Sequence, residues 1–168
     1  TSDAYFLDSG DKIRVFYEKD FANHLSKEGI GRARLINKVG HALHDLDPVF
    51  DKFSRAKKLE DLCLALGIER ALILQSMYIF KQPFIGGEVN CHQDGSFIYC
   101  EPDSMIGLWV ALENATIENG CLWAIPQGHK GPLRTRFVRE GYQTRFLELD
   151  STPFDEDNMR PLEIKKGG

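Results

Sequence analysis

The sequence predicts a mainly β fold with flanking helices, and the helices are concentrated in the first half of the chain. From residue 71 to residue 126, short apolar runs follow one another and are divided by turn sequences, a spacing typical of an antiparallel barrel or sandwich. Between residues 47 and 67, hydrophobic residues instead recur at helical intervals. A chain of 168 residues with 42% hydrophobic content can bury one sizeable core, so we expect a single domain over residues 1–168.

The first expected element is a strand within residues 11–21, DKIRVFYEKDF. Ile13, Val15 and Tyr17 occupy alternate positions there, and alternate side chains of a strand lie on the same face. We therefore expect these three side chains to form the buried face of the strand.

Two helices are expected after this strand. Asp47 precedes Pro48, and aspartate is a favoured N-cap while proline is favoured at the first helical position, so a helix should begin at Pro48. A second helix should cover residues 55–67, RAKKLEDLCLALG, because its apolar residues have helical spacing and Gly67 is a typical stop.

The second half of the chain carries a series of expected strands. The first lies within residues 71–83, ALILQSMYIFKQP, and is ended by Pro83 and the pair Gly86–Gly87. A turn at residues 118–120 predicts a hairpin. Further strands are expected within residues 96–102, 105–115, 120–126 and 161–166.

Charge and composition argue against several classes of protein. The net charge is −4 and no stripe of lysine and arginine is present, which argues against nucleic-acid binding. No apolar run approaches the ~20 residues that cross a bilayer, and the four cysteines lack the C-x-x-C spacing of a zinc cluster. We expect a monomer that acts on a small-molecule substrate, without nucleic-acid or membrane partners. The cytoplasm is the default compartment, and the peroxisome is left open.

The stretch GGEVNCHQDGSF, residues 86–97, places His92 and Asp94 two positions apart. On an extended backbone, residues i and i+2 point to the same side, so an imidazole nitrogen and a carboxylate oxygen can bind one divalent metal. These residue types suit Fe(II), because a site of two histidines and one carboxylate leaves positions open for a co-substrate and oxygen. The alternative is a hydrogen-bonded surface pair, which a bare H-x-D pattern favours.

Two long segments around this pair carry a resemblance: QSMYIFKQPFIGGEVNCHQDGSFIY, residues 75–99, and GLWVALENATIENGCLWAIPQGHKG, residues 107–131. They resemble the phytanoyl-CoA dioxygenase family, most closely its domain-containing subgroup, and the resemblance covers nearly the whole chain. It implies a double-stranded β-helix, or jelly-roll, fold, a single Fe(II), and 2-oxoglutarate and O2 as co-substrates. The implied reaction couples oxidative decarboxylation of 2-oxoglutarate to hydroxylation of a small substrate such as an acyl-CoA.

The resemblance also assigns residues to the site. His92 and Asp94 correspond to iron ligands, and the carboxylate of Asp94 favours hydroxylation, since related halogenases carry a small residue at this position. Lys38, Met77 and Trp109 are assigned to 2-oxoglutarate contacts, which suits a point charge for a carboxylate and two apolar walls. From the residues alone, Met77 and Trp109 can equally be core, and Lys38 can be solvated.

The sequence departs from the family pattern near its C-terminal end. The family's distal iron histidine, and the arginine that pairs with 2-oxoglutarate, follow a turn like that at residues 165–168. The expected strands also number fewer than the roughly eight of a jelly-roll. We therefore expect an oxygenase domain incomplete at both ends, which continues beyond Gly168. His129 is interpreted as a loop residue, and His41 and His44 as core or capping residues, in preference to metal ligands.

Two other functions are compatible with the sequence. Without the distal histidine and the arginine, the domain would be an inactive or regulatory β-barrel module, although its unpaired strand edges would promote aggregation. A cupin-like metal hydrolase or isomerase would use the same metal ligands without consuming 2-oxoglutarate. The intact pair of His92 and Asp94 favours the oxygenase over the inactive module.

Overall fold

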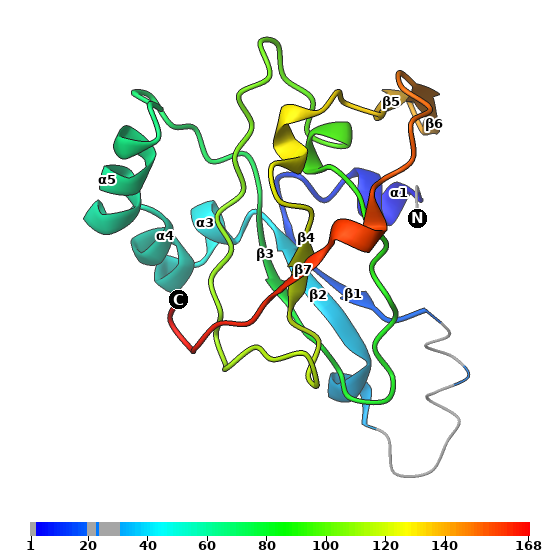
Figure 1. Cartoon of the computed structure of the whole chain (residues 1–168). Coiled ribbons are helices and arrows are strands. Elements are labelled where there is room, and N and C mark those ends of the chain that lie inside the picture. The colour runs from blue at the N-terminus through cyan, green and yellow to red at the C-terminus, as the bar shows by residue number, and fades with distance from the viewer. Residues whose placement is uncertain (1–2, 20–22, 24–30) are drawn as a thin grey trace. The chain divides into compact units, whose positions relative to one another are not determined.

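The computed structural model describes residues 3–19, 23 and 31–168 (Figure 1). The chain divides into two compact units, Thr1–Gly87 and Glu88–Gly168. The elements of the first unit are α1 (Ala4–Leu7), β1 (Ile13–Tyr17), η1 (Arg32–Leu35), β2 (Ile36–His41), α3 (Leu43–Leu46), α4 (Pro48–Ser54), α5 (Lys57–Ala65) and β3 (Ser76–Ile79). Those of the second unit are η2 (Asp94–Ser96), β4 (Leu122–Ala124), η3 (Gly128–Lys130), β5 (Thr135–Glu140), β6 (Gln143–Glu148), η4 (Glu156–Asn158) and β7 (Arg160–Leu162). The single domain expected over residues 1–168 stays a prediction.

An antiparallel sheet with β2 between β1 and β3 organises the first unit. β1 confirms the strand expected within residues 11–21, but the expected buried face is wrong. Ile13 and Tyr17 are exposed, whereas the ring of Phe16 packs against that of Phe6 with centroids 5.8 Å apart. Because α1 supplies an aromatic ring on this side, burial of aromatic surface favours the face that carries Phe16.

Two histidines lie in the core of the first unit. Both are buried, and each Nδ1 lies close to a serine hydroxyl: His41 is 2.7 Å from the Oγ of Ser9, and His44 is 2.8 Å from the Oγ of Ser76. Burial, and secondarily the charge of Lys38, lowers the pKa of His41. The core role expected for both histidines is confirmed.

Glu18 is a buried carboxylate directly after β1, with 5% of its surface exposed. Its Oε1 accepts a hydrogen bond from the Nδ2 of Asn37 at 3.1 Å, and its Oε2 accepts one from the backbone N–H of Gly87, also at 3.1 Å. The preceding Gly86 passes so close to Gln82 that a Cβ there would lie 2.9 Å from its carbonyl oxygen. Glu18 therefore fastens the glycine pair to the central strand of the sheet.

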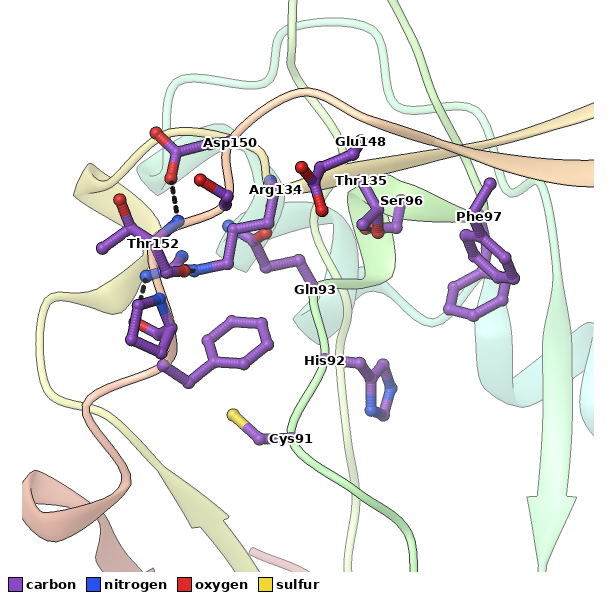
Figure 2. Close-up of a pocket in the computed structure, with 14 residues that line it drawn as sticks. Cys91, His92, Gln93, Ser96, Phe97, Arg134, Thr135, Glu148, Asp150 and Thr152 are labelled. Atoms are coloured by element: carbon purple, nitrogen blue, oxygen red, sulfur yellow. Dashed lines mark hydrogen bonds between the residues drawn. The ribbon is translucent and has the colours of Figure 1, made fainter.

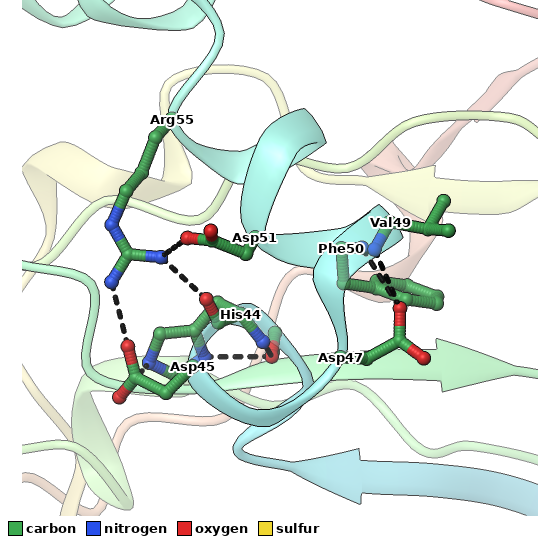
Figure 3. Close-up of polar contacts among 8 residues, drawn as sticks. His44, Asp45, Asp47, Val49, Phe50, Asp51 and Arg55 are labelled. Carbon is green, nitrogen blue, oxygen red and sulfur yellow. Dashed lines mark hydrogen bonds and ion pairs between the residues drawn. The ribbon is translucent and has the colours of Figure 1, made fainter.

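Arg55 joins α3 to the end of α4 through polar contacts (Figure 3). Its guanidinium lies 2.6 Å from the Oδ1 of Asp45, pairs also with Asp51, and donates to the carbonyl oxygen of His44. The hydrogen bond from Arg55 lowers the pKa of the Asp45 carboxyl. Because these charges are exposed, each pair contributes little to stability, and the network chiefly fixes the path of the chain between the two helices.

Helices α4 and α5 confirm the two helices expected from the sequence. Ahead of α4, one carboxylate oxygen of Asp47 accepts hydrogen bonds from the backbone N–H groups of Val49 and Phe50 at 2.9 and 3.1 Å (Figure 3). After α5, Gly67 has a φ of 83°, the left-handed conformation in which glycine ends helices at little cost. Both boundaries follow from local chemistry.

Replacing Asp47 with alanine should lower the free energy of unfolding by about 1 kcal/mol, because two N–H groups of the first turn lose their acceptor. Urea unfolding followed by circular dichroism measures this change. Asp47→Asn is the matched control, since asparagine caps helices about as well as aspartate. Equal losses in the two variants would contradict a capping role.

The strands of the second unit form two separate pairs. β4 pairs with β7, where Leu122 lies opposite Leu162, so the strands expected within residues 120–126 and 161–166 are confirmed. The strands expected within residues 96–102 and 105–115 are wrong: the first range begins in the turn η2, and the second contributes only an isolated bridge through Ala115. Strand propensity alone does not make a strand, since a continuous neighbour must pair with it.

The hairpin of β5 and β6 was not expected from the sequence. Glu140 pairs with Gln143 at its end, which leaves a two-residue loop of Gly141 and Tyr142. Gly141 has a φ of 63°, as the first loop residue of a type II′ turn requires. The glycine between two alternating runs was the signal that could have revealed this hairpin.

The structure combines strands with helices, as the sequence predicts in outline. Within residues 3–19, 23 and 31–168, the strands pair as three separate sheets, and the jelly-roll stays a prediction. In the same ranges, no helix has the length and apolar character needed to cross a membrane.

Candidate metal site at His92 and Asp94

His92 and Asp94 face one another in the second unit. The Nε2 of His92 lies 3.2 Å from the Oδ1 of Asp94, and 45% and 62% of their side-chain surfaces are exposed. The other ring nitrogen, Nδ1, lies 2.8 Å from the carbonyl oxygen of Asn90. A carbonyl only accepts, so Nδ1 carries a proton and Nε2 is the atom available to a metal.

The local backbone explains why the two side chains meet. Gln93 between them has φ −112° and ψ 125°, so the chain is extended there and residues 92 and 94 project to the same side. Figure 2 shows the side chains of Cys91 and Gln93 on one side of the backbone and the ring of His92 on the other. The turn η2 then bends the chain away directly after the pair.

The spacing of the two atoms suits a shared metal ion. Two neighbouring ligands at about 2.1 Å from an octahedral ion stand ~3.0 Å apart, close to the 3.2 Å between Nε2 and Oδ1. A hydrogen bond from His92 lowers the pKa of Asp94, and that contact in turn raises the pKa of His92 against the effect of burial. A metal cation bound by both atoms would compete with protons for them.

The remaining surroundings of the pair come from glycine and aromatic residues. A Cβ at Gly107 would lie 3.6 Å from the Oδ2 of Asp94, so the backbone of Gly107 runs beside the carboxylate. Two residues later, Trp109 is partly exposed. On the other side, the ring of His92 lies edge-on to that of Phe97, with centroids 6.2 Å apart.

Lys38 and Met77 lie on one face of the sheet in the first unit. Lys38 is paired with Ile79, and Met77 with Gly40, so the two predicted side chains are diagonal neighbours across β2 and β3. A Cβ at Gly40 would lie 3.0 Å from the Cγ of Met77. Glycine at this position therefore leaves room for the side chain of Met77.

Lys38 is a half-buried ammonium among aromatic rings. Its Nζ lies 5.6 Å from the centroid of Phe6 and 5.7 Å from that of Phe16. Burial lowers its pKa. Within the described part of the chain, no carboxylate pairs with Lys38. Its partly desolvated ammonium group can therefore still bind an anion.

The predicted residues thus fall into two groups. His92 and Asp94 meet in the second unit, and Lys38 and Met77 share a sheet face in the first. Across residues 3–19, 23 and 31–168, no three histidine, cysteine, aspartate or glutamate residues gather as a metal cluster. His129 lies exposed in η3, in agreement with its interpretation as a loop residue.

A cavity of about 310 Å³ adjoins His92 (Figure 2). Its wall includes Arg134, whose guanidinium lies 4.3 Å from the ring centroid of Phe154 and donates from Nε to the carbonyl oxygen of Thr152 at 2.7 Å. Gln93 also lines it. Sequence reasoning did not single out these residues, because their proximity depends on the unexpected β5–β6 hairpin.

Comparisons with known proteins identify the relatives of this chain. The sequence profile of the family described as Phytanoyl-CoA dioxygenase (PhyH) matches residues 2–168. Phytanoyl-CoA dioxygenase from Arabidopsis thaliana is 46% identical over 167 residues, which cover 99% of this chain and 59% of that protein. Phytanoyl-CoA dioxygenase 1 from Oryza sativa subsp. japonica is 47% identical over 163 residues, 97% of this chain and 58% of that protein.

A third relative is phytanoyl-CoA dioxygenase domain-containing protein 1 from Rattus norvegicus, 44% identical over 169 residues, 98% of this chain and 58% of that protein. The chain therefore spans less than two thirds of the length of these relatives. The match over nearly every residue confirms the resemblance carried by the segments around His92 and Trp109. The chain belongs to the phytanoyl-CoA dioxygenase (PhyH) family.

Proposed function

We propose that the protein is an Fe(II)- and 2-oxoglutarate-dependent dioxygenase that hydroxylates a small-molecule substrate. The observation that carries the proposal is the 3.2 Å approach of the Nε2 of His92 to the Oδ1 of Asp94, in a chain of the PhyH family. These two atoms would hold the iron. When bound, Fe(II) would supply the oxidising chemistry, in which one atom of O2 enters succinate and the other the substrate.

The chain's own residues hold the ligand atoms in place. The carbonyl oxygen of Asn90 fixes the Nδ1 proton of His92. This contact orients the ring and keeps Nε2 free, as hydrogen-bond acceptors beside metal-binding histidines do. The carboxylate of Asp94 would supply a second ligand to the metal. Because both side chains are about half exposed, co-substrate and substrate can approach from solvent.

Lys38 and Met77 are proposed to bind 2-oxoglutarate. A carboxylate near the Nζ of Lys38 would offset the desolvation that lowers the pKa of this lysine. Met77 and Trp109 would supply apolar contacts to the carbon chain of the co-substrate. We also propose that these residues are carried on the jelly-roll fold that the family resemblance implies.

The cavity beside His92 is proposed to receive part of the substrate. Phe97, Phe146 and Phe154 line it together with Arg134, Glu148 and Asp150, so its wall combines aromatic surface with charged groups of both signs. Such a lining suits a molecule that has both an apolar part and a polar part. An acyl-CoA is one substrate of this class.

Succinate formation tests the proposed function. The full-length protein, supplied with Fe(II), 2-oxoglutarate and O2, should release succinate and CO2, and removal of the metal by a chelator should stop the reaction. Addition of Fe(II) to the chelated protein should restore it. A metal-loaded protein that forms no succinate would overturn the proposal and favour the inactive or regulatory module.

Replacing Lys38 with alanine should raise the KM for 2-oxoglutarate about tenfold or more and change kcat less, because a charge-assisted hydrogen bond contributes about 1.5–3 kcal/mol to ground-state binding. Initial rates of succinate release at varied 2-oxoglutarate measure both constants. Lys58→Ala, which removes an exposed lysine of α5, is the control. An unchanged KM in Lys38→Ala would return Lys38 to a structural role among its aromatic neighbours.

A further inference from the structure

Gln93 lies between the two proposed ligands and is held on the opposite side of the backbone (Figure 2). Its Nε2 donates to the carbonyl oxygen of Pro132 at 3.0 Å, and its Oε1 accepts from the backbone N–H of Arg134 at 2.9 Å. Both hydrogen-bonding groups of the amide are therefore used by one short segment that leads into β5.

Ser96 makes a second connection to the same segment. It is buried, with 3% of its surface exposed, and its Oγ lies 3.1 Å from the Oγ1 of Thr135. Its backbone N–H donates to the carbonyl oxygen of Gln93 at 3.0 Å, which closes the turn that contains Asp94. The turn is thus tied to residues 132–135 on both sides of the proposed carboxylate ligand.

These contacts are suited to fixing direction more than to adding stability. A glutamine side chain loses much rotamer freedom when both ends of its amide are bound, and this loss is comparable to the net gain from two hydrogen bonds that replace bonds to water. The main effect of the two hydrogen bonds is therefore on the geometry of the chain. With Gln93 held toward residues 132–134, extended backbone turns His92 and Asp94 to the other side.

We propose that Gln93 is a positioning residue, which sets the direction in which His92 and Asp94 present their ligand atoms. The inference rests on the proposed function, because it assigns a partner to the metal ligands. Without the two bonds, the segment 92–94 could rotate about its φ and ψ angles, and the 3.2 Å approach of Nε2 to Oδ1 would be one conformation among several.

Metal affinity separates positioning from a structural role. In the full-length protein, Gln93→Met keeps the length of the side chain and removes both hydrogen bonds. We expect the Kd for Co(II), followed by its visible absorption, to rise about 10–100-fold, as for other residues that orient metal ligands. The thermal unfolding temperature of the metal-free protein should fall by only about 2 °C or less.

Two further variants complete the test. Gln143→Met makes the same chemical change at an exposed position of β6 and should leave the Kd for Co(II) unchanged. Gln93→Glu keeps an acceptor for the N–H of Arg134 and loses the donor to Pro132, so its Kd should lie between those of wild type and Gln93→Met. This variant keeps the inference testable if Gln93→Met does not fold.

The outcomes distinguish the inference from the function on which it rests. Wild-type affinity for Co(II) in Gln93→Met would overturn the positioning role, while binding by wild type would leave the proposed metal site standing. A large fall in unfolding temperature with an unchanged Kd would make Gln93 a purely structural residue and would also overturn the inference. If the wild-type protein itself binds no Co(II), the proposed function and the inference both fall.

Discussion

Replacing His92 or Asp94 with alanine is expected to abolish succinate formation from 2-oxoglutarate in the full-length protein. Changing a residue that only orients a metal ligand typically costs 10–100-fold in affinity or activity, so removing a ligand should cost more than about 100-fold. Each variant also loses the 3.2 Å pairing of Nε2 with Oδ1. Succinate release and Co(II) titration, run in parallel, measure turnover and metal binding.

The control for this experiment is Asp103→Ala, which removes an exposed carboxylate of the same unit. It should retain wild-type metal affinity and turnover. If His92→Ala or Asp94→Ala still forms succinate at the wild-type rate, the pair is a hydrogen-bonded surface contact. In that case the metal must be held elsewhere.

Replacing Glu18 with alanine is expected to lower the free energy of unfolding by about 3 kcal/mol. Glu18 is 5% exposed, and its loss leaves two donors without their acceptor, the Nδ2 of Asn37 and the N–H of Gly87. A buried polar group that loses its partner costs about 1–3 kcal/mol, and hydrogen bonds to charged groups lie at the upper end. Urea unfolding at pH 7 measures the change.

Two further variants define what the carboxylate of Glu18 contributes to the free energy of unfolding. Glu69→Ala removes an exposed glutamate of the same unit and should change the free energy of unfolding by less than about 0.5 kcal/mol. Glu18→Gln keeps one acceptor oxygen and should fall between wild type and Glu18→Ala. If the free energy of unfolding falls no more in Glu18→Ala than in Glu69→Ala, contacts other than those of Glu18 must hold Gly87 in place.

The helix boundaries could be predicted because their causes are local. The carboxylate of Asp47 reaches N–H groups two and three residues ahead, and Gly67 ends α5 through its own φ. The strands were harder, because pairing depends on residues far along the chain. Residues 105–115 have the composition of a strand and lack a continuous neighbour. Phe16 packs against a ring from α1, a contact that alternation within β1 does not reveal.

Part of the candidate site could likewise be predicted from the sequence, and part could not. The common direction of His92 and Asp94 follows from the two-residue period of extended backbone, and the geometry agrees with it. The resemblance assigned Lys38 and Met77 to one ligand, and the register of β2 and β3 places them on one face. The partners of Gln93 could not be predicted, since residues 132 and 134 reach it only through the hairpin that sequence reasoning missed.

The way Gln93 is bound has a consequence for how this region can evolve. Both of its partners are backbone atoms. The contact therefore depends on the path of the chain and does not require particular side chains at positions 132 and 134. For the contact with Gln93, position 134 needs only its backbone N–H, which proline alone lacks. Selection on this contact should therefore act on the length of the chain, so that insertion or deletion of one residue between 132 and 134 is purged. Selection on the side chain at 134 would come instead from its place in the cavity wall.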